Sequence, residues 1–212
     1  MALLLRKGSF LHKVAGRLFM ISIILMVPII SAETWLSPCS ISPLGILFVF
    51  FITYLVTSAW STIYHPEGKL VTLDKIAPLV ALGIFIAGLI LGFDATSNPS
   101  ETESSHIKEA YFFFSAIAFI AMLLDANNLK KVGVRGNHRV VRHVWRMCCA
   151  MFFAVSTLFT GPGSIVFPES LRGNPLLSIP ELLVVLLAAY WIYRLIFLKQ
   201  RFLPKNTTPD LK

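Results

Sequence analysis

A basic stretch at residues 137–147, NHRVVRHVWRM, holds the side chains best suited to chemistry in this chain. On a helix with about 100° per residue, its basic and imidazole groups fall within one arc of about 140°. These groups are His138, Arg139, Arg142, His143 and Arg146. The opposite side carries valine and tryptophan side chains, which suit lipid or the interior of a helical bundle.

The depth of this stretch predicts a buried partner for its last arginine. A helix rises about 10 Å between Arg139 and Arg146, so Arg146 is expected below the lipid headgroups. A charge at that depth is usually paired, and Asp125 ends the preceding apolar run at a similar depth. We therefore expect a polar cluster at the cytoplasmic mouth of the bundle. It comprises Arg17, Asp125, Arg139, Arg142 and Arg146, with His12 and His143 beside them.

Such a cluster is compatible with a structural ion-pair lock, a proton or anion path, or part of a ligand pocket, and the sequence favours the lock. The alternative is that the basic stripe extends to anionic headgroups and anchors the protein in the membrane. Membrane lipids are the partners expected on either interpretation.

The cysteines and histidines predict no metal site. Cys39, Cys148 and Cys149 show no spacing typical of zinc ligands, and the adjacent pair suits small buried positions. His12 and His143 are weak candidate ligands for a b-type haem near the cytoplasmic face. No cofactor is favoured.

The composition places the chain in a membrane. Of 212 residues, 56% are hydrophobic and 14% are charged, and the mean hydropathy is +0.73. A soluble domain normally has about a quarter of its residues charged. These values exclude a disulfide scaffold, a disordered chain and an ordinary cytosolic enzyme. The net charge of +8 does not indicate nucleic-acid binding, because the basic residues flank apolar runs.

Six apolar runs approach the roughly 20 residues that a membrane-spanning helix needs. They cover about 14–32, 42–63, 75–93, 109–126, 140–161 and 177–198. None alternates with a period of two, which argues against a β-barrel. The prediction is an all-α polytopic membrane protein, with residues 1–212 forming one domain of about six transmembrane helices.

Small residues indicate where these helices approach one another. Gly88 and Gly92 have the GxxxG spacing, and Gly83 lies on the same run. Gly16 at the start of the first run is expected to allow a close neighbour in the same way.

The charge distribution predicts the orientation. With six crossings, 17 of the 19 lysine and arginine residues lie on the side of the N-terminus, and only Lys108 and Arg172 lie on the other. Basic loops stay in the cytoplasm, so both termini are expected there. The first run also resembles a cleavable signal peptide, but its basic leader is long, and we expect the helix to be retained.

Several stretches resemble a family of uncharacterised bacterial multi-pass inner-membrane proteins that share a domain of unknown function. They are His12-Lys13-x-x-Gly16-Arg17, Leu55-x-x-x-Ala59-Trp60, Asp125-x-x-x-Leu129-Lys130 followed by Gly133 and Arg135-Gly136, and the specific Arg142-His143-x-Trp145-Arg146-Met147. The resemblance covers most of the chain. It implies a helical bundle in a bacterial inner membrane and brings no activity, substrate or cofactor.

The leading hypothesis is a non-enzymatic membrane protein, either a small transport or permeation component or a scaffold. The first alternative is a redox protein that binds haem at the inner face. The second is a membrane enzyme that binds lipid headgroups through the basic stripe, although no nucleophile is evident.

Overall fold

The computed structural model describes residues 8–36, 43–97, 105–131 and 133–197, and its long elements are all helices. Their bounds are α1 Phe10–Leu36, α2 Pro43–Tyr64, α3 Thr72–Ser97, α4 Ser105–Lys130, α5 Asn137–Phe159 and α6 Ile179–Phe197. Two short 3-10 turns, η1 Pro162–Val166 and η2 Pro175–Ser178, join α5 to α6. Each expected apolar run corresponds to one helix, so the prediction of an all-α polytopic bundle is confirmed.

Five of these helices are long and apolar enough to cross a membrane on their own. The spans are Phe10–Ile29, Pro43–Tyr64, Thr72–Ser97, Ile107–Lys130 and Pro175–Phe197. The sixth helix, α5, differs because three arginines lie in its first ten residues. Its polar half must be covered by protein, since a charge facing hydrocarbon is costly.

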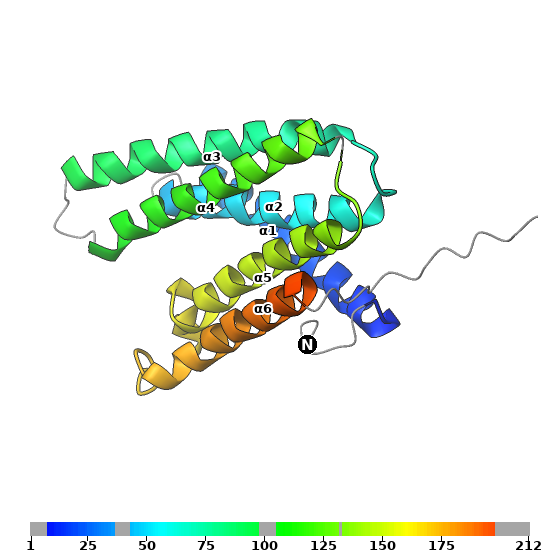
Figure 1. The fold of residues 1–212 in the computed structure, drawn as a ribbon. Coiled ribbons are helices and arrows are strands. Elements are labelled where there is room, and N and C mark those ends of the chain that lie inside the picture. Colours follow the sequence, from blue (N-terminus) through cyan, green and yellow to red (C-terminus); the bar gives the residue numbers. More distant parts are fainter. Residues whose placement is uncertain (1–7, 37–42, 98–104, 132, 198–212) are drawn as a thin grey trace, which may run out of the picture.

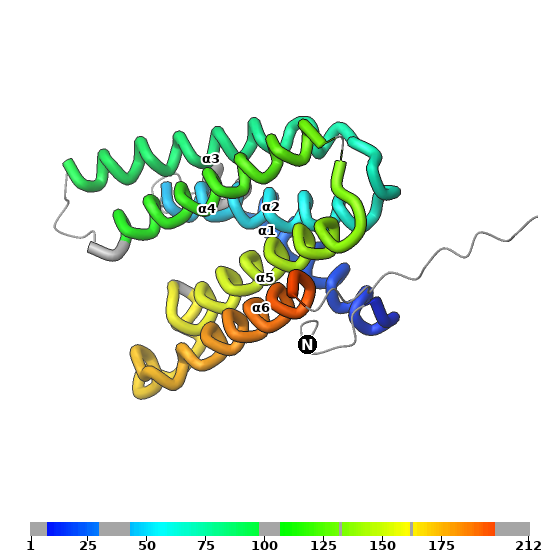
Figure 2. The backbone as a smooth tube through the Cα atoms, viewed as in Figure 1, coloured from blue at the N-terminus to red at the C-terminus, as the bar shows by residue number. Residues whose placement is uncertain are grey.

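The helices form two pairs with α2 between them. Figure 1 shows α3 beside α4 on one side of α2, and α5 beside α6 on the other. In the described residues, α1 packs only against α2. The tube in Figure 2 shows that the α2–α3 and α4–α5 connections lie at the same end of the bundle. Gly68 in the first connection donates its backbone N–H to the Val134 carbonyl in the second. This common end is the one that the charge distribution predicts to be cytoplasmic.

Glycines bring α3 and α4 together, as the GxxxG spacing predicted. A Cβ on Gly88 would lie 2.2 Å from Ser115 Oγ and 3.2 Å from the Tyr111 carbonyl oxygen of α4. A Cβ on Gly92 would lie 3.1 Å from the Phe112 ring. The two backbones can therefore approach this closely only because side chains are missing here.

The same expectation is wrong for two other glycines. A Cβ built on Gly16 or Gly83 meets nothing within 4 Å. Gly16 lies on α1, which has a single neighbour, and Gly83 lies on the exposed side of α3. Spacing identifies a packing glycine only when it falls on the side of the helix that faces a neighbour.

The cysteines of α5 follow the sequence-based expectation of small buried residues. Cys148 is buried and Cys149 is half-buried. Cys39 lies outside the described residues.

Candidate functional site

The basic side of α5 faces the interior of the bundle. Arg139, Arg142 and Arg146 are only 9%, 7% and 0% exposed, whereas His138 is exposed. Since α5 packs against α2 and α6, this side is covered by protein. The alternative expectation, that the stripe extends to lipid headgroups, is therefore wrong for these arginines. The same finding weakens the hypothesis of an enzyme that holds headgroups through this stripe.

Asp125 is the centre of the buried contacts. Its Oδ1 accepts from Arg146 Nη2 at 2.5 Å and from Arg142 Nη2 at 3.0 Å. Its Oδ2 accepts the hydroxyl of Tyr54 on α2 at 2.6 Å. The side chains of Asp125 and Arg146 are both fully buried. The predicted pairing of Asp125 with Arg146 is thus confirmed, and one carboxylate joins α2, α4 and α5.

Arg142 extends this network to α3. Its Nη1 lies 3.0 Å from Asp74 Oδ1, while its Nη2 holds Asp125, so one guanidinium bridges two carboxylates. Asp74 also accepts the Val71 backbone N–H at 3.3 Å, as an acid in the first turn of a helix often does. We call Tyr54, Asp74, Asp125, Arg142 and Arg146 the polar layer.

The polar layer is balanced in charge but not in hydrogen bonds. Two carboxylates face two guanidinium groups. Nε of Arg142 and both Nε and Nη1 of Arg146 have no hydrogen-bond partner among the described residues. The Arg146 guanidinium instead lies 5.4 Å from the centre of the Tyr54 ring and 5.2 Å from that of Trp145. Cation–π contact offsets part of the cost of its burial.

Arg139 closes the end of α2 just outside the polar layer. It donates to the backbone carbonyl of Thr62 at 2.5 Å, to that of Ile63 at 2.7 Å and to that of His65. The last carbonyls of a helix lack intrahelical partners and carry partial negative charge, which a guanidinium satisfies. Arg139 also lies 3.7 Å from Glu67. It is a structural cap that fixes α5 against α2.

Two glycines let the connections at this end meet. Gly68 and Gly133 have φ values of +72° and +96°, a region that other residues rarely adopt. A Cβ on Gly133 would lie 3.2 Å from the Gly68 Cα. The α2–α3 and α4–α5 connections are therefore in direct contact with each other at this end of the bundle.

The remaining candidates lie at the margin of this site. His143 Nδ1 is 3.0 Å from the Ala59 carbonyl oxygen on α2. A histidine that ligates a metal through one ring nitrogen often bonds a backbone carbonyl through the other. His12 on α1 is half-buried, and its backbone N–H donates to Ser9 Oγ. Arg17 is exposed, and no ion pair joins it to the polar layer in the described part of the chain. The expected cluster thus forms without Arg17. Haem ligation by the two histidines stays a prediction.

Sequence reasoning missed two members of the polar layer. Tyr54 lies within an apolar run, and Asp74 lies at a predicted helix start, where an acid is ordinary. The distribution of acidic residues along the sequence could have identified Asp74. The acids expected at this end between residues 43 and 146 are Glu67, Asp74 and Asp125, and each pairs with an arginine of α5.

A layer of phenylalanines follows the polar layer toward the other membrane face. The Phe153 ring of α5 lies 5.4 Å from Phe51 of α2 and 5.1 Å from Phe114 of α4. Phe48 and Phe113 contact the same ring at 6.3 and 6.0 Å. We call these five residues the phenylalanine layer. It fills the space between α2, α4 and α5 with apolar side chains.

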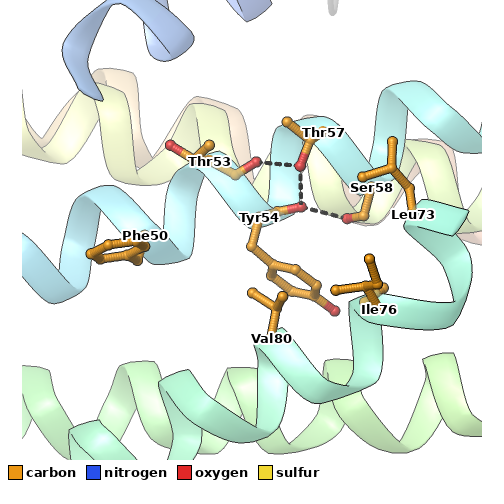
Figure 3. Close-up of a pocket in the computed structure, with 9 residues that line it drawn as sticks. Phe50, Thr53, Tyr54, Thr57, Ser58, Leu73, Ile76 and Val80 are labelled. Carbon is orange, nitrogen blue, oxygen red and sulfur yellow. Dashed lines mark hydrogen bonds between the residues drawn. The ribbon is translucent and has the colours of Figure 1, made fainter. Parts of the chain in front are cut away.

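A cavity of about 170 Å³ lies between α2 and α3, beside the polar layer (Figure 3). Its walls include Phe50, Tyr54 and Thr57 of α2 and Leu73 and Val80 of α3. The Tyr54 ring separates this cavity from Asp125, because its hydroxyl is bonded there.

Within the described residues, no group of three or more histidine, cysteine or acidic side chains could hold a metal ion. No family model, curated protein or solved structure matches this chain.

Proposed function

We propose that this protein is a non-enzymatic transport or permeation component of a bacterial inner membrane, and that the polar layer holds it closed at its cytoplasmic end. One observation carries the proposal. The carboxylates come from the α3–α4 pair and the guanidinium groups from α5. In the described residues, no Cα of α5 comes within 8 Å of α3 or α4. The direct contacts between the α3–α4 pair and α5 are therefore made by side chains.

The energetic cost of burying these charges favours a gate over a purely structural ion-pair lock. Removing two charges from water costs several kcal/mol per ion, and apolar residues of similar size would hold the helices as well or better. Ionisable groups inside a membrane protein mark pathways for ions or substrates more often than simple packing. Arg146 is fully buried, and its Nε and Nη1 have no hydrogen-bond partner among the described residues, so this side chain gains hydrogen bonds if the layer opens.

The phenylalanine layer would close the proposed path at a second level, in addition to the polar layer. From Arg146 to Phe153, α5 rises about 10 Å, so the two layers are separated by about two turns. Both layers lie between α2, α4 and α5, and in both of them α4 and α5 are joined by side chains, since no Cα of α5 comes within 8 Å of α4 in the described residues. Separation of the α3–α4 pair from α5 would open both.

The orientation and the bacterial membrane rest on the sequence. The 17 basic residues on the side of the N-terminus support a cytoplasmic polar layer, and the Arg142-His143-x-Trp145-Arg146-Met147 stretch supports a bacterial inner-membrane protein.

The test is ion leakage from vesicles that contain the purified protein. Vesicles loaded with KCl and a pH-sensitive dye report K⁺ and proton release. The wild type should be tight. The double variant Asp125→Asn/Arg146→Gln, which keeps the layer neutral, should leak, and Phe153→Ala should leak further in the same background. Asp94→Asn, an exposed position at the far end of α3, is the matched control and should stay tight.

Folded double variants that remain as tight as the wild type, with and without Phe153→Ala, would reject the permeation proposal. The polar layer would then be a structural lock in a scaffold.

A further inference from the structure

The cavity between α2 and α3 is oriented along the bundle rather than across it. Phe50 and Thr57 are two turns apart on α2, and Leu73 and Val80 are two turns apart on α3. Seven residues of helix rise about 10 Å, so both walls extend that far along neighbouring helices. A cavity with this direction runs roughly parallel to the acyl chains of a bilayer.

The walls of this cavity are mostly carbon. Phe50, Leu73 and Val80 are aliphatic or aromatic, and the Tyr54 ring forms the inner wall. The hydroxyl of Thr57 donates to the Thr53 carbonyl one turn earlier at 2.7 Å, as the dashed lines of Figure 3 show. Both helices span the membrane, so the surrounding medium is hydrocarbon, and an acyl chain is the matching occupant.

The hydroxyls of Thr53, Thr57 and Ser58 also line the cavity, and exposed polar side chains follow at one end of the same stripe. Tyr64 follows Thr57 by another seven residues on α2 and is 67% exposed. Its ring stacks on Trp60 with centres 4.5 Å apart, an arrangement typical of aromatic residues at the membrane surface. Lys69 in the α2–α3 connection is exposed, four residues before Leu73. Its backbone N–H donates to the Pro66 carbonyl, which fixes the turn.

We propose that this cavity is a phospholipid site, in which one acyl chain fills the space between α2 and α3 and the phosphate is held by Tyr64 and Lys69. A phenol donor and an ammonium group complement a phosphodiester anion. The acyl chain packs on the Tyr54 ring, whose hydroxyl donates to Asp125. The site shares Tyr54 with the polar layer but does not depend on the permeation proposal.

Photolabelling of the full-length protein in nanodiscs tests the site. The probe is phosphatidylglycerol with a diazirine in the middle of one acyl chain, and labelled peptides are located by mass spectrometry. Residues 50–58 and 73–80 of the wild type should be labelled above the other helices. Val80→Trp places an indole in the cavity and should remove this labelling. Leu79→Trp, the neighbouring position that does not line the cavity and is 67% exposed, should keep it.

A second probe separates phosphate recognition from general lipid contact. Diacylglycerol with the same diazirine chain lacks the phosphate, and it should label the cavity about fivefold less, as expected for one basic residue beside an anion. Lys69→Gln should remove most of that difference. Equal labelling in Val80→Trp and wild type, or equal labelling by the two probes, would overturn the proposal.

Discussion

Replacing Asp125 with asparagine removes one of the two negative charges in the polar layer and leaves two guanidinium groups facing Asp74 alone. Asp125 is fully buried, and its carboxylate accepts three hydrogen bonds, from Tyr54, Arg142 and Arg146. Breaking a buried ion pair costs about 3–5 kcal/mol, because the charge left behind stays uncompensated. Asparagine keeps one acceptor, so we expect a loss of about 3 kcal/mol in the free energy of unfolding.

Arg146→Gln creates the opposite imbalance, with one guanidinium facing two carboxylates, and should cost a similar amount. The double variant is neutral again, because Arg142 and Asp74 remain paired at 3.0 Å. We therefore expect the double variant to lose about 2–3 kcal/mol less than the sum of the single losses, near the upper end of measured coupling energies.

Arg142 provides a sharper comparison. Asp125→Asn/Arg142→Gln leaves Arg146 with Asp74, and no contact joins these two side chains in the described residues. This double variant should recover less than Asp125→Asn/Arg146→Gln although both are neutral. The difference in stability between the two double variants separates the effect of contact geometry from that of net charge.

Unfolding by SDS in mixed detergent micelles, followed by circular dichroism, measures these energies. The exposed pair Glu169–Arg172, at 4.0 Å, supplies a control cycle with an expected coupling below about 1 kcal/mol. Additivity of Asp125→Asn and Arg146→Gln to within about 0.5 kcal/mol, or equal recovery with either arginine, would refute the reasoning.

Three other changes have expected outcomes in thermal unfolding in detergent. Gly88→Ala should destabilise by about 1–3 kcal/mol, because its Cβ would collide with Ser115, whereas Gly83→Ala should be neutral or stabilising by about 0.5 kcal/mol; equal effects would contradict the α3–α4 contact. Thr53→Val should stabilise by about 1 kcal/mol, since Thr53 Oγ1 is buried without a partner among the described residues, and a loss would mean that it is satisfied. Arg139→Gln should destabilise by about 1–3 kcal/mol and speed hydrogen exchange at the end of α2; unchanged exchange there would argue against capping.

The sequence was sufficient for the fold because apolar length and helix count are local properties. Each span reads directly from about 20 apolar residues, and the alternating sides of the connections follow from an even number of crossings. The pairing of Asp125 with Arg146 was predictable for a related reason. Two opposite charges at one depth on consecutive helices have few other partners in a bilayer.

The rest of the site depends on how the helices rotate and pack, which the sequence does not specify. Tyr54 is indistinguishable in the sequence from an aromatic residue facing lipid. Arg17 has the expected depth, but it lies on α1, which contacts only α2 in the described residues. Depth in the membrane therefore predicted Asp125 correctly and Arg17 wrongly. Whether a charged residue at that depth joins the polar layer depends on which helices its own helix packs against.

The order of the charges along the chain explains how α5 can belong to the bundle although it is the least apolar of its helices. Each arginine at the centre of a spanning helix costs about 2.5–3.5 kcal/mol on insertion when it is unpaired. The acids that pair with Arg139, Arg142 and Arg146 all precede α5 in the sequence. Their segments are synthesised first, so α5 meets its counter-charges as it enters the membrane. Its position is thus fixed by tertiary pairing rather than by its own hydropathy, and the ion pairs that allow it to insert are the same ones that separate when the proposed gate opens.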